Sequence, residues 1–265
     1  MGAQGGAGMK VWVLMENQAC GPEFVSEHGL SLYIETGDLH ILFDAGQSGA
    51  FADNAERLGV DLSRADFAVL SHGHYDHGGG LARFMDCNDH AAIYVSRHAF
   101  GAYYNAAGKY IGLPPKLAES TRLVYVDKGI CLAPGIELYS QIVLPPARTD
   151  GLKRLEQGRY LDEDFRHEQY LVITEQGRRI CISGCAHRGV VGIAQYFRPD
   201  VLIGGFHFKG IDPESPELAH AINALMELPT VYYTGHCTGE MQYHRMKKIM
   251  GGQLMNFRTG MILDI

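Results

Sequence analysis

The sequence feature that most constrains this chain is a run of three histidines and one aspartate within six residues. His72, His74, Asp76 and His77 follow the apolar residues 67–70, and three consecutive glycines come directly afterwards. At the end of an extended strand alternate side chains point the same way, so His72 and His74 can reach one metal ion. Asp76 and His77 come where the chain turns and can face a second ion. Imidazole and carboxylate groups suit Zn²⁺, Fe or Mn²⁺, so the sequence predicts a metal centre here.

Composition limits the class of protein to which such a centre can belong. The chain has 265 residues, of which 46% are hydrophobic and 20% charged, an ordinary globular composition. Its net charge of −7 gives no general reason to bind nucleic acid or an anionic membrane. No apolar run approaches the roughly 18 residues of a membrane span. The start of the chain does not read as a secretory signal, so we expect a cytoplasmic protein with reduced cysteines.

Short apolar segments that alternate with amphipathic ones predict a sheet core flanked by helices. We expect one domain over residues 9–265, preceded by a disordered tail or cloning remnant over residues 1–8. Residues 97–121, which carry three tyrosines and a Pro-Pro step, predict an irregular insertion that could act as a lid. Strands are expected at 10–15, 30–35, 41–44, 67–70, 92–95, 123–126, 171–174, 179–182, 201–203, 231–233 and 261–263, and helices at 50–58, 79–85, 190–196, 216–228 and 240–250.

A series of histidine-bearing motifs follows these segments in a fixed order. The motifs are EHGLS from residue 27, SHGHYDH from residue 71, GCAHRG from residue 184, GGFH from residue 204 and TGHCTG from residue 234. The second contains H-x-H-x-D-H, and the series resembles the dihydropteroate-synthase-like branch of the metallo-β-lactamase superfamily. The resemblance covers nearly the whole chain. It implies an α+β fold, the metallo-β-lactamase-type four-layer αββα sandwich, with a dinuclear metal site at one edge of the two sheets.

The resemblance also implies a ligand set for two divalent cations, with zinc favoured and manganese or iron as alternatives. The ligands of the first cation would be His72, His74 and His187, and those of the second would be Asp76, His77 and His236. Asp76 would in addition serve catalysis as a possible acceptor of a proton from water.

Around these ligands the sequence departs from the common pattern of the superfamily. Many members carry a bridging aspartate in a Gly-Asp step, where this chain has Gly184-Cys185. Cys185 could therefore be a thiolate ligand in that position, or a residue packed beside the ligands. Glu168, with His167, precedes the same strand and is another possible contributor. By resemblance, Asp44 would be the carboxylate that accepts a hydrogen bond from a histidine ligand and so orients its ring.

Four further residues are candidates for catalysis or substrate binding. His207 follows an apolar strand and could bind substrate or transfer a proton, since an ordinary histidine titrates near neutral pH. His28 would face the site by resemblance only. Lys109, with Lys116, Arg97 and Tyr103 nearby, could meet a phosphate group. Thr238 could bind substrate, although capping of the following helix is the simpler role.

These observations favour a metal-dependent hydrolase, or a dihydropterin-phosphate synthase-like enzyme, that acts on a small phosphorylated or pterin-like substrate. Two adjacent cations can polarise a substrate oxygen and lower the pKa of bound water. The absence of the G-x-S-x-G and P-loop motifs agrees with metal chemistry. Two alternatives remain: a mononuclear iron redox enzyme of the same fold, similar to sulfur dioxygenases, and a non-catalytic metal-binding module.

Overall fold

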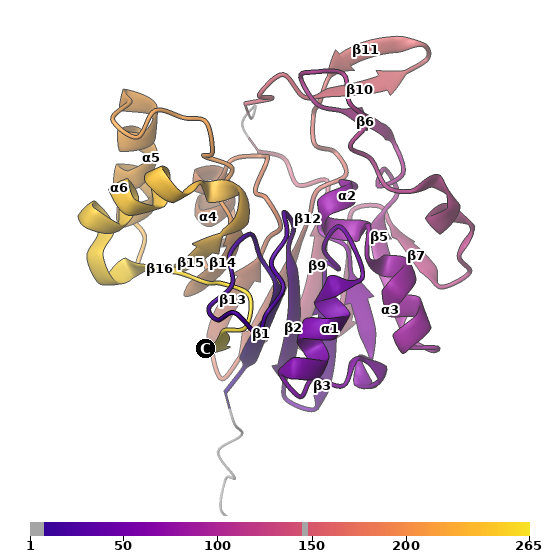
Figure 1. Cartoon of the computed structure of the whole chain (residues 1–265). Helices are drawn as coiled ribbons and strands as arrows, with labels where there is room; N and C mark the ends of the chain where they lie inside the picture. Colours follow the sequence, from indigo (N-terminus) through magenta and orange to yellow (C-terminus); the bar gives the residue numbers. More distant parts are fainter. Residues whose placement is uncertain (1–7, 145–147) are drawn as a thin grey trace, which may run out of the picture.

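The computed structural model describes residues 8–144 and 148–265, so the predicted tail lies outside the described residues except for its last position. Two seven-stranded sheets pack face to face, and helices cover the outer face of each (Figure 1). The predicted four-layer αββα sandwich is therefore confirmed. No helix in these two stretches is both long and apolar enough to cross a membrane.

The first sheet contains both antiparallel and parallel strands, in the order β17-β1-β2-β3-β4-β5-β7. From β3 to β7 the neighbours run parallel, so the carboxyl ends of these strands lie at one edge. The strands are β1 (Lys10–Met15), β2 (Ser31–Thr36), β3 (Leu39–Phe43), β4 (Phe67–Val69), β5 (Ala92–Ser96), β7 (Leu123–Val126) and β17 (Ile262–Asp264).

The second sheet has the order β16-β15-β14-β13-β12-β9-β8. Its strands β13 to β16 run parallel, which again gathers their carboxyl ends at one edge. The strands are β8 (Gly129–Ala133), β9 (Ile136–Ser140), β12 (Gln169–Glu175), β13 (Arg178–Ile182), β14 (Val201–Gly205), β15 (Val231–Gly235) and β16 (Leu254–Asn256).

Three buried clusters hold the four layers together. Ile34 and Ile41 of the first sheet and Ile173 and Ile180 of the second belong to one cluster between the sheets. A second cluster lies under the helices of the first sheet, and a third under those of the second (Figure 1). The helices are α1 (Ala50–Arg57), α2 (Tyr75–Gly78), α3 (Leu81–Cys87), α4 (Val190–Phe197), α5 (Pro216–Met226) and α6 (Glu240–Met250), with 3-10 turns η1 (Leu62–Arg64), η2 (Pro115–Glu119), η3 (His236–Thr238) and η4 (Gly251–Gln253).

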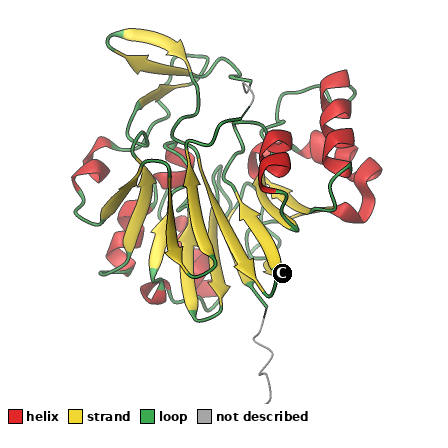
Figure 2. Cartoon of the chain, turned by 180° about the vertical axis from the view of Figure 1, so that it is seen from behind, coloured by secondary structure: helices red, strands yellow, loops and turns green. Residues whose placement is uncertain are grey.

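A small third sheet, absent from the sequence prediction, stands above one edge of the sandwich (Figure 2). It consists of β6 (Ala102–Tyr104), β10 (Lys153–Glu156) and β11 (Arg159–Asp162). The predicted insertion at residues 97–121 supplies β6 and η2, so it is more regular than expected. Its residue Ile111 accepts a hydrogen bond from the backbone of Tyr75 at 2.9 Å, which seats the insertion on the histidine-rich loop.

Candidate metal centre

The strand ends of the two sheets bring the predicted ligands together. His72 comes from the loop after β4, His77 from the single turn of α2, His187 from the turn after β13 and His236 from η3 directly after β15. All four side chains are almost fully buried. His77 and His236, for example, are 159 positions apart in the sequence and have ring nitrogens 3.2 Å apart. The sandwich therefore places histidines from distant segments in one pocket, as the sequence analysis predicted.

The first group of donors consists of three imidazoles, from His72, His74 and His187. One ring nitrogen of each lies within 4.8 Å of the others. The Nε2 atoms of His72 and His187 are 3.3 Å apart. The Nε2 atom of His74 is buried without any hydrogen-bond partner. A buried nitrogen without a partner is costly, so this cluster fits a divalent cation that would accept the three lone pairs.

The second group consists of Asp76, His77 and His236. His236 Nε2 lies 3.3 Å from Asp76 Oδ2 and 3.2 Å from His77 Nε2. His77 Nε2 is 3.7 Å from the same carboxylate oxygen. The two groups adjoin, since the rings of His72 and His77 have centroids 4.1 Å apart. The six predicted ligands thus form two adjacent sets of three, an arrangement that could hold two cations.

The sulfur atom of Cys185 lies among the donor atoms of the centre and is not separated from it by the ligands. Cys185 Sγ is 3.2 Å from His77 Nε2. This Sγ and one ring nitrogen from each of His72 and His77 all lie within 4.8 Å of one another. Burial raises the pKa of the Cys185 thiol well above its ordinary value. A thiolate would therefore need a bound cation beside it, which deprotonates a coordinating thiol. Of the two roles that the sequence left open, this geometry favours the ligand.

The protonation states of three histidines and of Asp76 suit metal binding. Burial and neighbouring histidines lower the pKa values of His72 and His187 well below the ordinary value, and burial lowers that of His74 to about 3. These rings are neutral at physiological pH, and a neutral imidazole is the form that binds a metal. Burial opposes ionisation of Asp76, but His77 and His236 lower its pKa below the ordinary value, so it is a carboxylate.

Asp44 supports ligands of both groups, as the resemblance implied. His77 Nδ1 donates to Asp44 Oδ2 at 2.6 Å, which leaves Nε2 facing the site. Ser71 donates its hydroxyl to the same carboxylate at 2.7 Å and lies 2.8 Å from His72 Nδ1. Burial lowers the pKa of His77, but Asp44 and Asp76 raise it to about 9, so both ring nitrogens carry protons without a metal and a bound cation would displace the proton on Nε2. Such partners fix the orientation of ligating histidines.

The end of β1 orients the last ligand, a role that the sequence analysis missed. His236 Nδ1 donates to Asn17 Oδ1 at 2.9 Å, and Asn17 Nδ2 donates to the His236 carbonyl at 3.1 Å. The backbone nitrogen of His236 donates to Glu16 Oε1 at 2.6 Å. His236 adopts a positive φ of 52°, which costs on the order of 1–3 kcal/mol, and these bonds hold it there.

His167 and Glu168 support the backbone that carries the ligands. His167 Nδ1 accepts the backbone hydrogen of Gly73 at 2.7 Å, directly inside the histidine-rich loop. Both oxygens of Glu168 are occupied, one by the backbone nitrogen of His187 at 2.8 Å and the other by Arg188 and Tyr170. These contacts fix the backbone around three ligands and occupy both oxygens of Glu168, whereas His167 Nε2 is buried without a hydrogen-bond partner, 3.7 Å from Glu163 Oε1.

The structure changes the expected chemistry of His207. Its Nε2 forms an ion pair with Asp150 at 3.1 Å, and its ring lies 4.2 Å from that of His187. Burial lowers the pKa of His207, but Asp150 and Cys237 raise it to about 10. His207 is therefore a cation at neutral pH and not the near-neutral acid or base that the sequence suggested. It remains beside the centre as a positive charge.

The other three candidates occupy different positions. His28 lies beside the centre, with Nε2 3.3 Å from Asp76 Oδ2 and a half-exposed side chain. Thr238 is buried and lines a cavity beside His236, and its hydroxyl accepts from the Phe206 backbone at 3.0 Å and lies 2.5 Å from the Thr234 hydroxyl. The predicted capping role is wrong, since Gly239 is the N-cap of α6. Lys109 is exposed, with its ammonium 5.7 Å from the centre of the Tyr75 ring.

The residues suggested to accompany Lys109 are engaged elsewhere. Arg97 is paired with Asp127 at 3.2 Å. Tyr103 is buried, donates its hydroxyl to the His98 carbonyl and stacks on His167 with ring centroids 4.1 Å apart. Tyr103 therefore offers no free hydroxyl, so a phosphate contact on this insertion would depend on the half-exposed Arg97 and the exposed Lys109 and Lys116.

A four-layer sandwich with a histidine-rich centre at the shared edge of its sheets defines a class of metal-dependent proteins. The chain belongs to the metallo-beta-lactamase superfamily, whose family model matches residues 27–236.

Two similar proteins lie within this superfamily. The chain is 31% identical over 260 residues to the 7,8-dihydropterin-6-methyl-4-(beta-D-ribofuranosyl)-aminobenzene-5'-phosphate synthase of Methanocaldococcus jannaschii, with 87% of this chain and 88% of that protein covered. The crystal structure of Tm1679, described as a metal-dependent hydrolase of the beta-lactamase superfamily, superimposes with a TM-score of 0.80 at 27% identity and covers 97% of this chain and 99% of its own.

Proposed function

We propose that this protein is an enzyme that holds two divalent cations, with zinc favoured, and acts on a small phosphorylated or pterin-like molecule. The single observation that supports this most strongly is the convergence of two adjacent sets of three donors. The name of the M. jannaschii relative supports the substrate class. Hydrolysis and the synthase-type reaction both remain within this proposal.

In the proposed centre, His72, His74 and His187 would hold one cation, and Asp76, His77 and His236 the other. Cys185 would lie between them as a further ligand. When bound, the two cations would polarise a substrate oxygen and lower the pKa of water, so that no serine or cysteine nucleophile is needed.

The chain's own residues would then move the proton. Asp76 Oδ2 lies within 3.3 Å of both His236 Nε2 and His28 Nε2. Burial lowers the pKa of His28, so this ring is neutral at physiological pH and can accept a proton. Its side chain is 45% exposed, whereas that of Asp76 is 10% exposed. We propose that Asp76 accepts the proton from water and that His28 passes it to the solvent. His207 would contribute a fixed positive charge beside His187.

An activity screen tests the proposal. Zinc-loaded and manganese-loaded protein would be incubated with phosphorylated dihydropterins, phosphate mono- and diesters and simple lactones, with product detected by mass spectrometry. Turnover that falls at least ~100-fold in Asp76→Asn, and about 10-fold in His28→Phe, supports the assigned roles. His90→Phe, which changes a histidine outside the centre, is the control. Equal activity in Asp76→Asn would refute them.

A further inference from the structure

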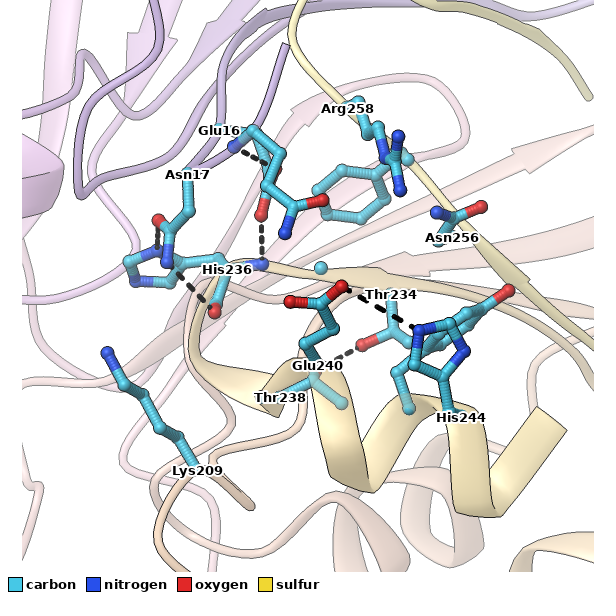
Figure 3. Close-up of a pocket in the computed structure, with 15 residues that line it drawn as sticks. Glu16, Asn17, Lys209, Thr234, His236, Thr238, Glu240, His244, Asn256 and Arg258 are labelled. Carbon is cyan, nitrogen blue, oxygen red and sulfur yellow. Dashed lines mark hydrogen bonds and ion pairs between the residues drawn. The ribbon is translucent and has the colours of Figure 1, made fainter. Parts of the chain in front are cut away.

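A second polar cavity adjoins the centre on the far side of His236 (Figure 3). Its volume is about 260 Å³. The segment after β1, the end of β15, the start of α6 and the end of β16 all contribute to its wall. We call it the α6 pocket and define it by Gln18, Lys209, Gly239, Tyr243, Asn256 and Arg258, together with the acids discussed next.

The two acidic residues of the α6 pocket have partners other than its basic residues. Glu16 is buried, and its two oxygens accept backbone hydrogens of His236 at 2.6 Å and Gln18 at 2.7 Å. Glu240 lies 3.7 Å from His244 on the next turn of α6. In the part of the chain that the structure describes, neither carboxylate forms an ion pair with Arg258 or Lys209.

The basic residues of the α6 pocket have no such partners. Arg258 is half-buried, and its Nε is a buried atom without a hydrogen-bond partner. Among the described residues, no carboxylate forms an ion pair with Arg258 or with Lys209. Lys209 reaches in from the side opposite Arg258 and Asn256 (Figure 3). An unpaired guanidinium inside a cavity is a built recognition group for a planar or tetrahedral oxyanion.

The position of the pocket connects it to the proposed reaction. His236 lines the α6 pocket, and its Nε2 faces the metal centre. The pocket and the centre therefore share His236 as a wall. The ring of His236 points away from Arg258 (Figure 3). Lys209 is close enough to influence His28 electrostatically, and His28 stacks on His236 with centroids 4.8 Å apart. A molecule bound in the α6 pocket would therefore lie directly beside the metal centre, with His236 between them.

We propose that the α6 pocket binds a phosphate group of the substrate, with Arg258 as the main anchor and Lys209 as a mobile cation at the rim. That the phosphate belongs to the substrate rests on the proposed function, whereas the existence of the binding site does not. The side-chain amides of Asn256 and Gln18 add donors, and the amino end of α6 at Gly239, which no side chain caps, lines the same cavity. Several donors around one cavity suit a phosphate, which has three acceptor oxygens, better than a carboxylate.

Titration calorimetry with inorganic phosphate tests the binding site. Because phosphate also binds metal ions, the measurement is made both in the zinc-loaded protein and in a His72→Ala, His74→Ala background. Arg258→Met should weaken phosphate binding at least ~10-fold in both, and Lys209→Met about 3-fold. Arg178→Met and Lys248→Met, at exposed positions outside the pocket, are matched controls and should leave binding unchanged.

Three outcomes would overturn the assignment. Phosphate binding that vanishes in the double-alanine background but survives Arg258→Met would place the anion on the metals alone. Tighter binding of acetate than of phosphate would point to a carboxylate ligand. Equal losses in the controls would show a nonspecific charge effect. None of these depends on turnover, so the binding site can fail while the proposed function stands. Where a phosphorylated substrate is turned over, Arg258→Met should raise KM with kcat largely kept.

Discussion

Replacement of Asp44 by asparagine tests how the centre is built, because the side chain keeps its shape and loses only its charge and one acceptor. Asp44 accepts three hydrogen bonds, from His77 Nδ1 at 2.6 Å and from the Ser71 backbone and hydroxyl at 2.7 Å each. The amide that replaces the carboxylate can accept at one oxygen only, so its NH₂ group meets a hydrogen-bond donor in either orientation. The loss of a charged acceptor costs about 1.5–3 kcal/mol.

That cost should appear as weaker cation binding, by about 10- to 100-fold. The second cation, which depends directly on His77, should be affected most, and the first less, because Ser71 alone transmits the change to His72. Competition with a chromophoric zinc chelator would give both dissociation constants. Asp38→Asn, at an exposed position between β2 and β3, is the control. Unchanged dissociation constants for both cations in Asp44→Asn would refute the reasoning.

Three further changes test separate parts of the structure. Asn17→Ala removes the acceptor from Nδ1 of His236 and should weaken the second cation about 10-fold in the same chelator assay; unaltered binding would show that Asn17 does not position this ligand. Gly73→Ala places a methyl group against the backbone of Ala99, so we expect zinc content by elemental analysis to fall, and wild-type content would contradict the close approach. Burial raises the pKa of Glu163 to about 7 from the ordinary 4.5, so the folded state binds the proton more tightly and stability falls as pH rises through this window. Urea unfolding at both ends of the window should show a fall that is about 1–3 kcal/mol smaller in Glu163→Gln, and identical pH dependence would exclude Glu163 as the cause.

Many of the strands could be predicted because local patterns of apolar residues specify them. Apolar runs marked strands such as β1 and β4, and the position of the histidines after such runs indicated which strand ends meet. The sequence missed β10 and β11, which are exposed and rich in charged side chains, so no apolar alternation signals them. It also missed β6, β8, β9, β16 and the single turn of α2, all of which are short.

The supporting contacts of the centre were harder to predict because they join distant segments. Asn17 and His236 are 219 positions apart, and no local pattern links an asparagine after one strand to a histidine after another. The charge of His207 depends on Asp150, which comes from a different loop. A sequence pattern identified the ligands, whereas the pKa values and orientations of those ligands follow from tertiary contacts.

The measurement that most directly tests the central claim is the zinc content of the purified, zinc-loaded chain and of two ligand variants. Our account predicts two zinc ions per chain in the wild type, about one in His236→Ala, and little or none in the His72→Ala, His74→Ala double variant. One ion per chain in the wild type, or iron bound in its place after aerobic purification, would favour a mononuclear centre. Full zinc content in the double variant would contradict the site itself.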